Sequence, residues 1–196
     1  FRQSNTILLD GGMGTMLQAA GLKLGARPEE LNITDPALIE GIHGQYAAAG
    51  SRIVNANTFG ASAHKLAGSA YMLEQVITAG IENCKRACAP YGALTALDVG
   101  PLGELLEPSG TLAFEDAVAE YARIVKAGEA AGADLIFFET YTDLYELKAA
   151  LLAAKENTHL PILASMSFEA GGRTFTGCTV ESFGVTARGL GADALG

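Results

Sequence analysis

Residues 131–140 read AGADLIFFET, and this stretch combines a glycine, an apolar run and a carboxylate in a pattern typical of a helix-to-strand join. Gly132 can adopt the left-handed conformation that ends a helix, and the apolar run after it has the length and composition of a buried strand. Glu139 then places a carboxylate at the end of that strand. The same helix, glycine and strand join recurs at 49–54 and 190–195. A repeated join of this kind predicts a β/α architecture with parallel strands.

Six short runs rich in Ile, Val, Leu and Phe alternate with longer segments of helical period. The predicted strands are Thr6–Asp10, Arg52–Asn57, Ala93–Val99, Asp134–Thr140, Pro161–Phe168 and Ala192–Gly196. The five intervals between their starts average about 37 residues, so eight units would need roughly 300 residues, which suits a (β/α)8 TIM barrel. The sequence therefore predicts an α/β chain with about the first six units of such a barrel. We expect one domain over residues 1–196, incomplete at its C-terminus.

An open, doubly wound parallel sheet, as in nucleotide-binding modules, is the alternative fold for six parallel strands. The first run ends in DGGMGT at 10–15, which lacks the full glycine spacing of a dinucleotide fingerprint. No acidic ribose ligand follows about 20 residues later. The barrel is therefore the favoured architecture.

The composition argues against several classes of function. The chain has 196 residues, of which 49% are hydrophobic and 18% charged, so it can bury a core. Its net charge of −9, without a run of Lys or Arg, repels phosphate backbones and anionic lipid, so we expect neither nucleic acid nor membrane as a partner. The three cysteines are an odd and sparse count that favours a reducing compartment, so we expect a cytoplasmic protein.

Helix starts are marked in the sequence by capping residues. Asp35 followed by Pro36 is typical of an N-cap with proline at the first helical position. Asp143 with Glu146 three residues later resembles a capping box. We expect helices to begin at both places, on the connections between strands.

Polar or glycine-rich residues close nearly every predicted strand at its carboxyl end. They are Asp10-Gly11-Gly12, Asn55, Asn57-Thr58, Asp98, Gly100, Glu139-Thr140, Ser165 and Ser167. In parallel β/α proteins these ends converge on the face where ligands bind. Asp10 and Glu139 stand out, because a carboxylate at the edge of an apolar core must be paired or accept hydrogen bonds to stay charged. Facing one cavity, the two would suit a substrate ammonium. An Asx turn at Asp10 and an internal ion pair at Glu139 are the structural alternatives.

Gly11, Gly12 and Met13 follow Asp10 and precede a predicted short helix. Glycines at a helix start let successive backbone N–H groups point toward an anion such as a carboxylate or phosphate. An ammonium site next to a carboxylate site makes an α-amino acid the expected ligand.

The cysteines and histidines of the chain form no evident metal site. Cys84 and Cys88 share one helical stripe with apolar residues, so we expect both in the core. Cys178 stands alone, and the three histidines show no ligand spacing. We therefore expect no metal ligand within these residues.

Six motifs together resemble the homocysteine S-methyltransferase domain family. They are DGGMGT at 10–15, PEELN at 28–32, NTFGA at 57–61, DVGPLG at 98–103, FET at 138–140 and GRTFTG at 172–177. They cover essentially the whole chain in the right order, and taken jointly they are specific although none is so alone. The chain most resembles the amino-terminal, homocysteine-binding module of the cobalamin-dependent methionine synthases.

This resemblance implies a (β/α)8 barrel that binds homocysteine and zinc and transfers a methyl group to the zinc-activated thiolate to give methionine. The substrate ammonium would be held by carboxylates at positions that match Asp10 and Glu139. The substrate carboxylate would lie on the backbone of the glycine loop at 11–13. Asn57 and Thr58 match family residues that line the same mouth.

The resemblance also implies groups that these residues do not supply. The zinc of the family is bound by three cysteines, one shortly after strand 6 and an adjacent pair after strand 8, so its ligands are expected beyond residue 196. For that reason we expect the isolated chain to be inactive. Cobalamin and methyltetrahydrofolate would act in other modules, and the cobalamin-binding module of the same polypeptide is the expected partner. A methyltransferase that uses betaine or S-methylmethionine directly, and a non-catalytic fragment that only binds an amino acid, are the alternatives.

Overall fold

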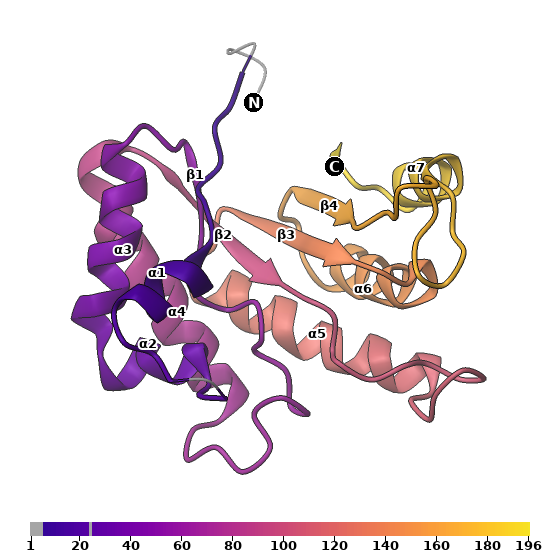
Figure 1. The fold of residues 1–196 in the computed structure, drawn as a ribbon, viewed down its shortest axis with the longest axis horizontal. Coiled ribbons are helices and arrows are strands. Elements are labelled where there is room, and N and C mark those ends of the chain that lie inside the picture. The colour runs from indigo at the N-terminus through magenta and orange to yellow at the C-terminus, as the bar shows by residue number, and fades with distance from the viewer. Residues whose placement is uncertain (1–5, 24) are drawn as a thin grey trace.

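The computed structural model describes residues 6–23 and 25–196, and in it helices alternate with parallel strands (Figure 1). Its strands are β1 (Ile53–Asn55), β2 (Leu94–Val99), β3 (Leu135–Tyr141), β4 (Ile162–Met166) and β5 (Ala194–Leu195). Within the described residues they form one sheet in the order β1-β2-β3-β4-β5, and every pair is parallel. This is the strand order of a TIM barrel, and it lacks the reversal that defines a doubly wound sheet. The barrel prediction is confirmed, and the open-sheet alternative is wrong.

The two ends of the predicted strand series are shorter in the structure than in the prediction. The segment Thr6–Asp10 lies beside β1, but only one isolated bridge joins Leu9 to Ile53. Leu8 is 57% exposed, so little packing holds this segment extended. At the other edge, the predicted run Ala192–Gly196 contains only the two-residue strand β5.

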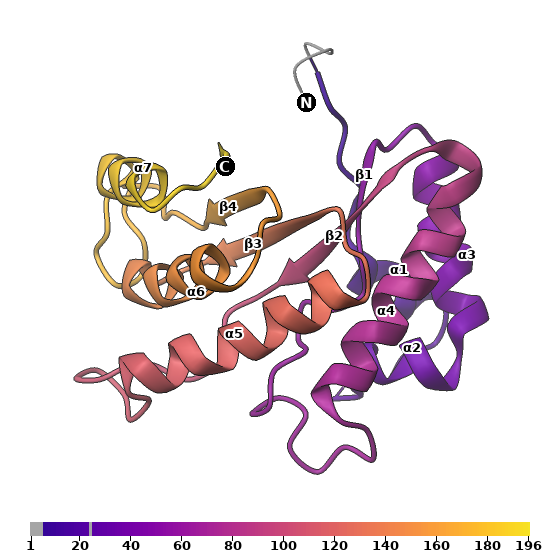
Figure 2. The same ribbon diagram turned by 180° about the vertical axis from the view of Figure 1, so that it is seen from behind.

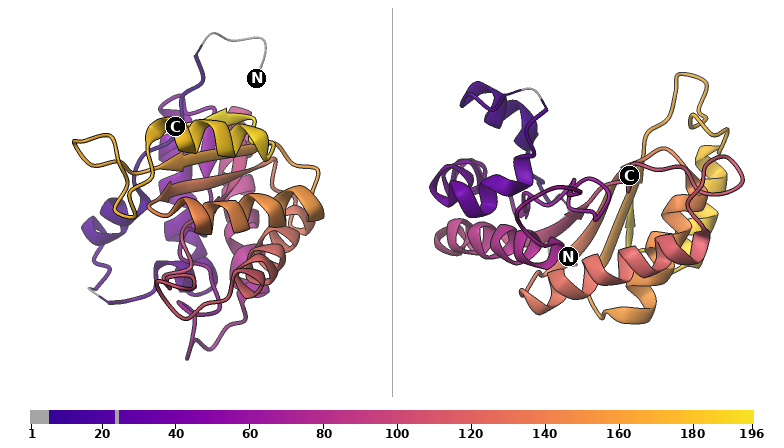
Figure 3. Two further views of the ribbon diagram at one scale, coloured as in Figure 1. Left: turned by 90° about the vertical axis from the view of Figure 1, so that its right-hand side faces the viewer. Right: turned by 90° about the horizontal axis from the view of Figure 1, so that it is seen from below.

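The longer helices lie on the outer side of the curved sheet and form an arc around it (Figure 2 and Figure 3, right). The helices are α1 (Met13–Ala19), α2 (Leu31–Thr34), α3 (Pro36–Ala48), α4 (Leu73–Cys88), α5 (Phe114–Ala130), α6 (Leu144–Asn157) and α7 (Val180–Gly189), with short 3-10 turns η1 (Pro28–Glu30) and η2 (Ala89–Tyr91). Neighbouring helices pack on one another, as α3 does on α4 and α5 on α6. Among the described residues, no helix has both the length and the apolar character needed to cross a bilayer.

Local signals in the sequence explain where these helices begin and end. Gly50, Gly132 and Gly191 have φ values of +109°, +88° and +93°, so each of the three predicted joins uses a left-handed glycine. Asp35 caps α3 by accepting a hydrogen bond from the backbone N–H of Leu38 at 3.2 Å. These joins return the chain directly from a helix into the next strand.

The capping box predicted for α6 is only half formed. Asp143 accepts a hydrogen bond from the N–H of Tyr145 at 3.0 Å, as an N-cap does. Glu146 is buried instead of returning to Asp143, and its Oε1 accepts hydrogen bonds from the N–H of Leu102 at 2.7 Å and the hydroxyl of Tyr121 at 2.9 Å. The carboxylate of Glu146 therefore binds the loop after β2 instead of completing the capping box.

Side chains alternate between two apolar layers, one on each face of the sheet. The inner layer consists of Ile53, Ala96, Leu135 and Leu163, with Ile7 and Phe137 packed against it. The outer layer lies between sheet and helices, and it includes Leu97, Val99, Ile136 and Phe138. A residue two positions after an inner-layer residue also points inward, which fixes the direction of the side chains at the strand ends.

Protonation of His43 is predicted to destabilise the fold at low pH. His43 lies on α3, is fully buried, and neither ring nitrogen has a hydrogen-bond partner. Burial lowers its pKa from 6.5 to about 4, so the unfolded chain takes up the proton first as the pH falls. The stability that neutral His43 provides is complete above pH 6.5 and is lost as the pH falls toward 4. The loss amounts to about 3 kcal/mol.

The test compares urea denaturation of the protein with that of a His43→Leu variant at pH 7 and pH 4.5. The carboxyl groups are common to both proteins, so the difference between the two pH profiles isolates the histidine. We expect the native protein to lose about 2 kcal/mol or more relative to the variant across this range. Parallel profiles would contradict the prediction.

Candidate functional site

A polar layer lies directly above the apolar inner layer, at the carboxyl ends of the strands. It is made of the inward-facing residues Asn55 on β1, Asp98 on β2, Glu139 on β3 and Ser165 on β4. Each follows an inner-layer residue by two positions, or by four where Phe137 intervenes. The polar strand ends therefore converge on one face, as the sequence predicts.

Asp10 joins this layer from the segment beside β1. Its Oδ2 accepts a hydrogen bond from the backbone N–H of Asn55 at 3.0 Å. Burial raises the pKa of Asp10 to about 7, against the stabilising effect of that hydrogen bond, and the charge of Glu139 raises it further. The structure thus brings Asp10, from the segment beside β1, and Glu139, on β3, within electrostatic reach of one another.

An extra residue in β3 sets the direction of Glu139. Phe138 pairs with Ala164 and Tyr141 with Met166. Between these two pairs β3 advances by three residues and β4 by two, so β3 contains one extra residue. The extra residue is Thr140, which has φ +56°, a conformation that costs a β-branched residue about 1–3 kcal/mol. The N–H of Thr140 donates a hydrogen bond to the hydroxyl oxygen of Ser165 at 2.9 Å. This bulge leaves Glu139 pointing inward and returns Tyr141 to the outer layer.

Asp98 is the deepest carboxyl group of the layer, and the sequence analysis gives it no role beyond its place at a strand end. Only 7% of the residue is exposed, and its Oδ1 has no hydrogen-bond partner. Its carboxyl group lies within electrostatic reach of the carboxyl groups of Glu139 and Asp10. Burial raises the pKa of Asp98 well above its usual range, and the charges of Glu139 and Asp10 raise it further. The signal available in the sequence was a carboxylate between two outward-facing apolar residues, Leu97 and Val99.

The glycine loop leads from this layer into α1. Gly11 and Gly12 are exposed, and Gly12 is the N-cap of α1 without a side-chain cap, so the first N–H groups of the helix lack intrahelical partners. The carbonyl of Gly12 accepts a hydrogen bond from the hydroxyl of Tyr46 at 3.2 Å. A Cβ atom at Gly11 would lie 3.0 Å from the same hydroxyl oxygen, so the loop has little room for a side chain. Met13 is the first residue of α1 and is partly buried.

Asn57, predicted to line the mouth, has structural partners in the chain. Its Nδ2 donates hydrogen bonds to the carbonyl of Pro28 at 2.8 Å and to Oδ1 of Asn32 at 2.9 Å, which uses both of its N–H groups. Nearby, Oε1 of Glu29 accepts a hydrogen bond from the N–H of Gly60 at 2.7 Å. Two of the sequence motifs, at 28–32 and 57–61, therefore hold each other in place.

Thr58 has a similar positioning role toward Asp98. Its side-chain hydroxyl donates to the carbonyl of Asp98 at 2.8 Å and accepts from the N–H of Asp98 at 3.2 Å. Thr58 is fully buried, so a direct contact with a ligand would require a rearrangement.

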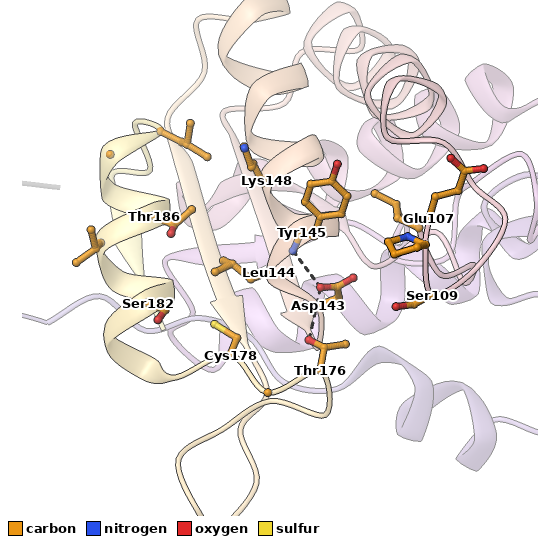
Figure 4. Close-up of a pocket in the computed structure, with 16 residues that line it drawn as sticks. Glu107, Ser109, Asp143, Leu144, Tyr145, Lys148, Thr176, Cys178, Ser182 and Thr186 are labelled. Carbon is orange, nitrogen blue, oxygen red and sulfur yellow. Dashed lines mark hydrogen bonds between the residues drawn. The ribbon is translucent and has the colours of Figure 1, made fainter.

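A large cavity lies elsewhere, on the outer side of the molecule (Figure 4). This outer groove of about 850 Å³ runs between the loop at 106–109, α6 and α7. Its Asp143 accepts hydrogen bonds from the N–H of Tyr145 at 3.0 Å and from the hydroxyl of Thr176 at 3.5 Å. None of the seven site residues predicted from the sequence lines it. Volume therefore does not identify the predicted site.

The cysteines do not form a zinc site. Cys84 and Cys88 are buried in the core with their sulfur atoms 3.8 Å apart, as predicted, and Cys178 lines the outer groove. In residues 6–23 and 25–196, no group of three His, Cys, Asp or Glu side chains is placed to hold a metal ion. The donor set of these residues does not fit zinc, which favours cysteine and histidine ligands in a tetrahedral arrangement.

Comparison with known proteins identifies the family of the chain. The family model described as homocysteine S-methyltransferase matches residues 7–196. The chain belongs to the homocysteine S-methyltransferase family. Among the relatives of this family member are the methionine synthases of Mycobacterium tuberculosis and Mycobacterium leprae, each 30% identical over 95% of this chain. The chain spans only 17% of the length of these two relatives.

Solved structures show the same fold for this family member. The homocysteine methyltransferase MmuM from Escherichia coli matches with a TM-score of 0.88 in its oxidized form and 0.87 in its metallated form. Both matches are 22% identical in sequence and cover 98% of this chain, against 73% and 74% of the MmuM chains. At this level of identity the likeness supports the barrel fold.

The space around two helical glycines predicts opposite effects on stability when each is replaced by alanine. A Cβ atom at Gly80 of α4 would lie 2.7 Å from Nδ2 of Asn32 and 2.8 Å from Cγ2 of Thr58, whereas one at Gly44 of α3 would meet no atom within 4 Å. Gly80→Ala should lower the free energy of unfolding by about 1–3 kcal/mol through overpacking. Gly44→Ala should raise it by about 0.5–1 kcal/mol through helix propensity. Urea denaturation measures both, and changes of the same sign would show that packing at Gly80 is not limiting.

Proposed function

We propose that this chain is the homocysteine-binding barrel domain, over residues 1–196, of an enzyme that transfers a methyl group to homocysteine to give methionine. The observation that carries the proposal is the cluster of inward-facing carboxyl groups at the carboxyl ends of the strands. One buried oxygen of this cluster, Oδ1 of Asp98, has no partner within the described chain. Such a site suits the ammonium group of an amino acid, and membership of the family identifies that amino acid as homocysteine.

In this proposal, Asp10 and Glu139 bind the substrate ammonium. Both carboxyl groups are partly buried and have raised pKa values, so each gains from a cation that restores its charged form. Asp10 is held by the N–H of Asn55, and Glu139 is aimed by the bulge at Thr140. Charge-assisted hydrogen bonds from an ammonium to two such carboxylates give both affinity and orientation.

The substrate carboxylate lies on the backbone N–H groups of Gly11, Gly12 and Met13 in the same proposal. These groups begin α1, where the helix dipole also favours an anion. Asn57 and Thr58 act as positioning residues, since their side chains bond to other parts of the protein. With both charged ends of the amino acid fixed, its thiol extends in one direction, which is the orientation that methyl transfer needs.

Zinc and the methyl donor are proposed to come from outside these residues. Zinc would supply a thiolate nucleophile at neutral pH, but residues 6–23 and 25–196 offer no ligand set for it. The proposal of cobalamin and methyltetrahydrofolate in other modules, with the cobalamin-binding module as partner, rests on the likeness to two methionine synthases that are much longer than this chain. The same likeness favours the cobalamin type over direct use of betaine or S-methylmethionine. The sparse, odd number of cysteines supports a cytoplasmic location for the enzyme.

Binding of homocysteine tests the proposed site. L-homocysteine should bind at least about tenfold more tightly than 4-mercaptobutyrate, which has the same thiol and carboxylate but lacks the ammonium group. Asp10→Asn and Glu139→Gln should each weaken homocysteine binding about 10- to 100-fold in calorimetric titrations at pH 8, because each loses a charge-assisted hydrogen bond.

The matched control is Glu156→Gln, which makes the same chemical change on an exposed residue of α6 and should leave binding unchanged. Equal affinity for the two ligands, or an unchanged affinity in both site variants, would refute the proposed ammonium site.

A further inference from the structure

We propose that Asp98 is a third carboxyl group of the ammonium site, and that it shares a proton with Glu139 in the free protein and releases it when an ammonium ligand binds. This inference rests on the proposed function. Binding then exchanges one proton, which leaves to solvent, for one substrate ammonium, so the total charge of the site stays the same. No other bond is made or broken. Asp98 thereby sets the charge state of Glu139.

The backbone and the carboxyl group of Asp98 differ in their hydrogen bonding. Thr58 satisfies both the N–H and the carbonyl of Asp98, but nothing in the described chain donates to Oδ1. The side chain points inward by the alternation of β2, two positions after Ala96 of the inner layer. A carboxyl oxygen that is buried without a donor is destabilising, and a ligand N–H group would supply the missing hydrogen bond.

Glu146 shows what a carboxyl group with a purely structural role looks like in this fold. It is buried as deeply as Asp98, with 4% of the residue exposed against 7%. Yet its Oε1 receives hydrogen bonds from Leu102 and Tyr121. The difference between Glu146 and Asp98 is therefore the missing donor rather than the depth of burial.

The charges around Asp98 explain why this group of carboxyls holds a proton in the free protein. Carboxyl groups act on it from three elements: Glu139 on β3, Asp10 beside β1, and Glu29 on η1. Among the described residues, Lys65 from the loop after β1 is a cation in electrostatic reach of Asp98, and the charge of Asp98 also acts on the hydroxyl of Tyr141 on β3.

The ammonium group of Lys65 contacts residues other than Asp98. Its Nζ donates to the carbonyl of Pro101 at 2.6 Å and lies 5.3 Å from the centre of the Phe59 ring. Carboxyl groups crowded in this way cannot all ionise, so they hold a proton until another cation replaces it.

The experiment counts the protons released on binding. The protein is titrated with L-homocysteine at pH 7 in buffers of different ionisation enthalpy, and the dependence of the heat on the buffer gives the number of protons per ligand. We expect the native protein to release about one proton or more, from Asp98 with Glu139 and in part from Asp10. Asp98→Asn keeps a permanent donor to Glu139 and should bind homocysteine while releasing at least about half a proton less. Asp10→Asn should retain the share that belongs to Asp98.

A second measurement needs no variant. The infrared difference spectrum of the native protein should lose the carbonyl stretch of a protonated carboxyl group when homocysteine binds, and it should keep that band with 4-mercaptobutyrate. An unchanged proton count in Asp98→Asn, or no loss of the band, would overturn the role of Asp98 while leaving homocysteine binding intact. Absence of homocysteine binding by the native protein would instead contradict the proposed function itself.

Discussion

The alternation of side chains along parallel strands is the constraint on which the candidate site depends. A strand that places Ala96 in the inner apolar layer must also point Asp98 inward, two residues later, into the polar layer above it. The same packing that joins the sheet to its inner layer therefore takes water away from the carboxyl groups above it. In β3 the alternation ends immediately after Glu139, because the extra residue Thr140 turns Tyr141 back toward the helices. The strain at Thr140 is local, and its effect is to keep one carboxylate inside the barrel and one aromatic ring outside it.

Hydrogen-bond donors divide the buried carboxyl groups into two kinds. Glu29 and Glu146 each accept a backbone N–H group from a loop, so they hold loops in place and are complete without a ligand. Within the described chain Asp98 has no donor for Oδ1, and the charges of Glu139, Asp10 and Glu29 oppose its ionisation. A folded chain retains such a group where something outside the protein, a proton or a cationic ligand, compensates for its burial. This contrast, and not the number of acidic residues, separates the candidate site from the rest of the molecule.

The sequence predicts those features that depend on a few neighbouring residues. The left-handed glycines, the cap at Asp35 and the order of the strands follow from local conformational preferences and repeated spacing, and the structure has them. The direction of Glu146 and the partners of Asn57 depend on loops distant in the sequence, which no local pattern reveals. The bulge could not be predicted either, because a β-branched residue at positive φ opposes local preference. The ammonium-binding roles of Asp10 and Glu139 remain predictions.

The chemistry of the polar layer locates the candidate site better than cavity volume does. The outer groove has a volume of about 850 Å³, but it lies between α6 and α7, which make few contacts, and its Asp143 is paired with Tyr145 and Thr176. A cavity at the mouth of a barrel needs walls on every side, and the five described strands supply only part of them. The polar layer therefore lies open. Its marks are a strained residue, an unpartnered buried oxygen and raised carboxyl pKa values, which arise from the chain itself whether or not the mouth is closed.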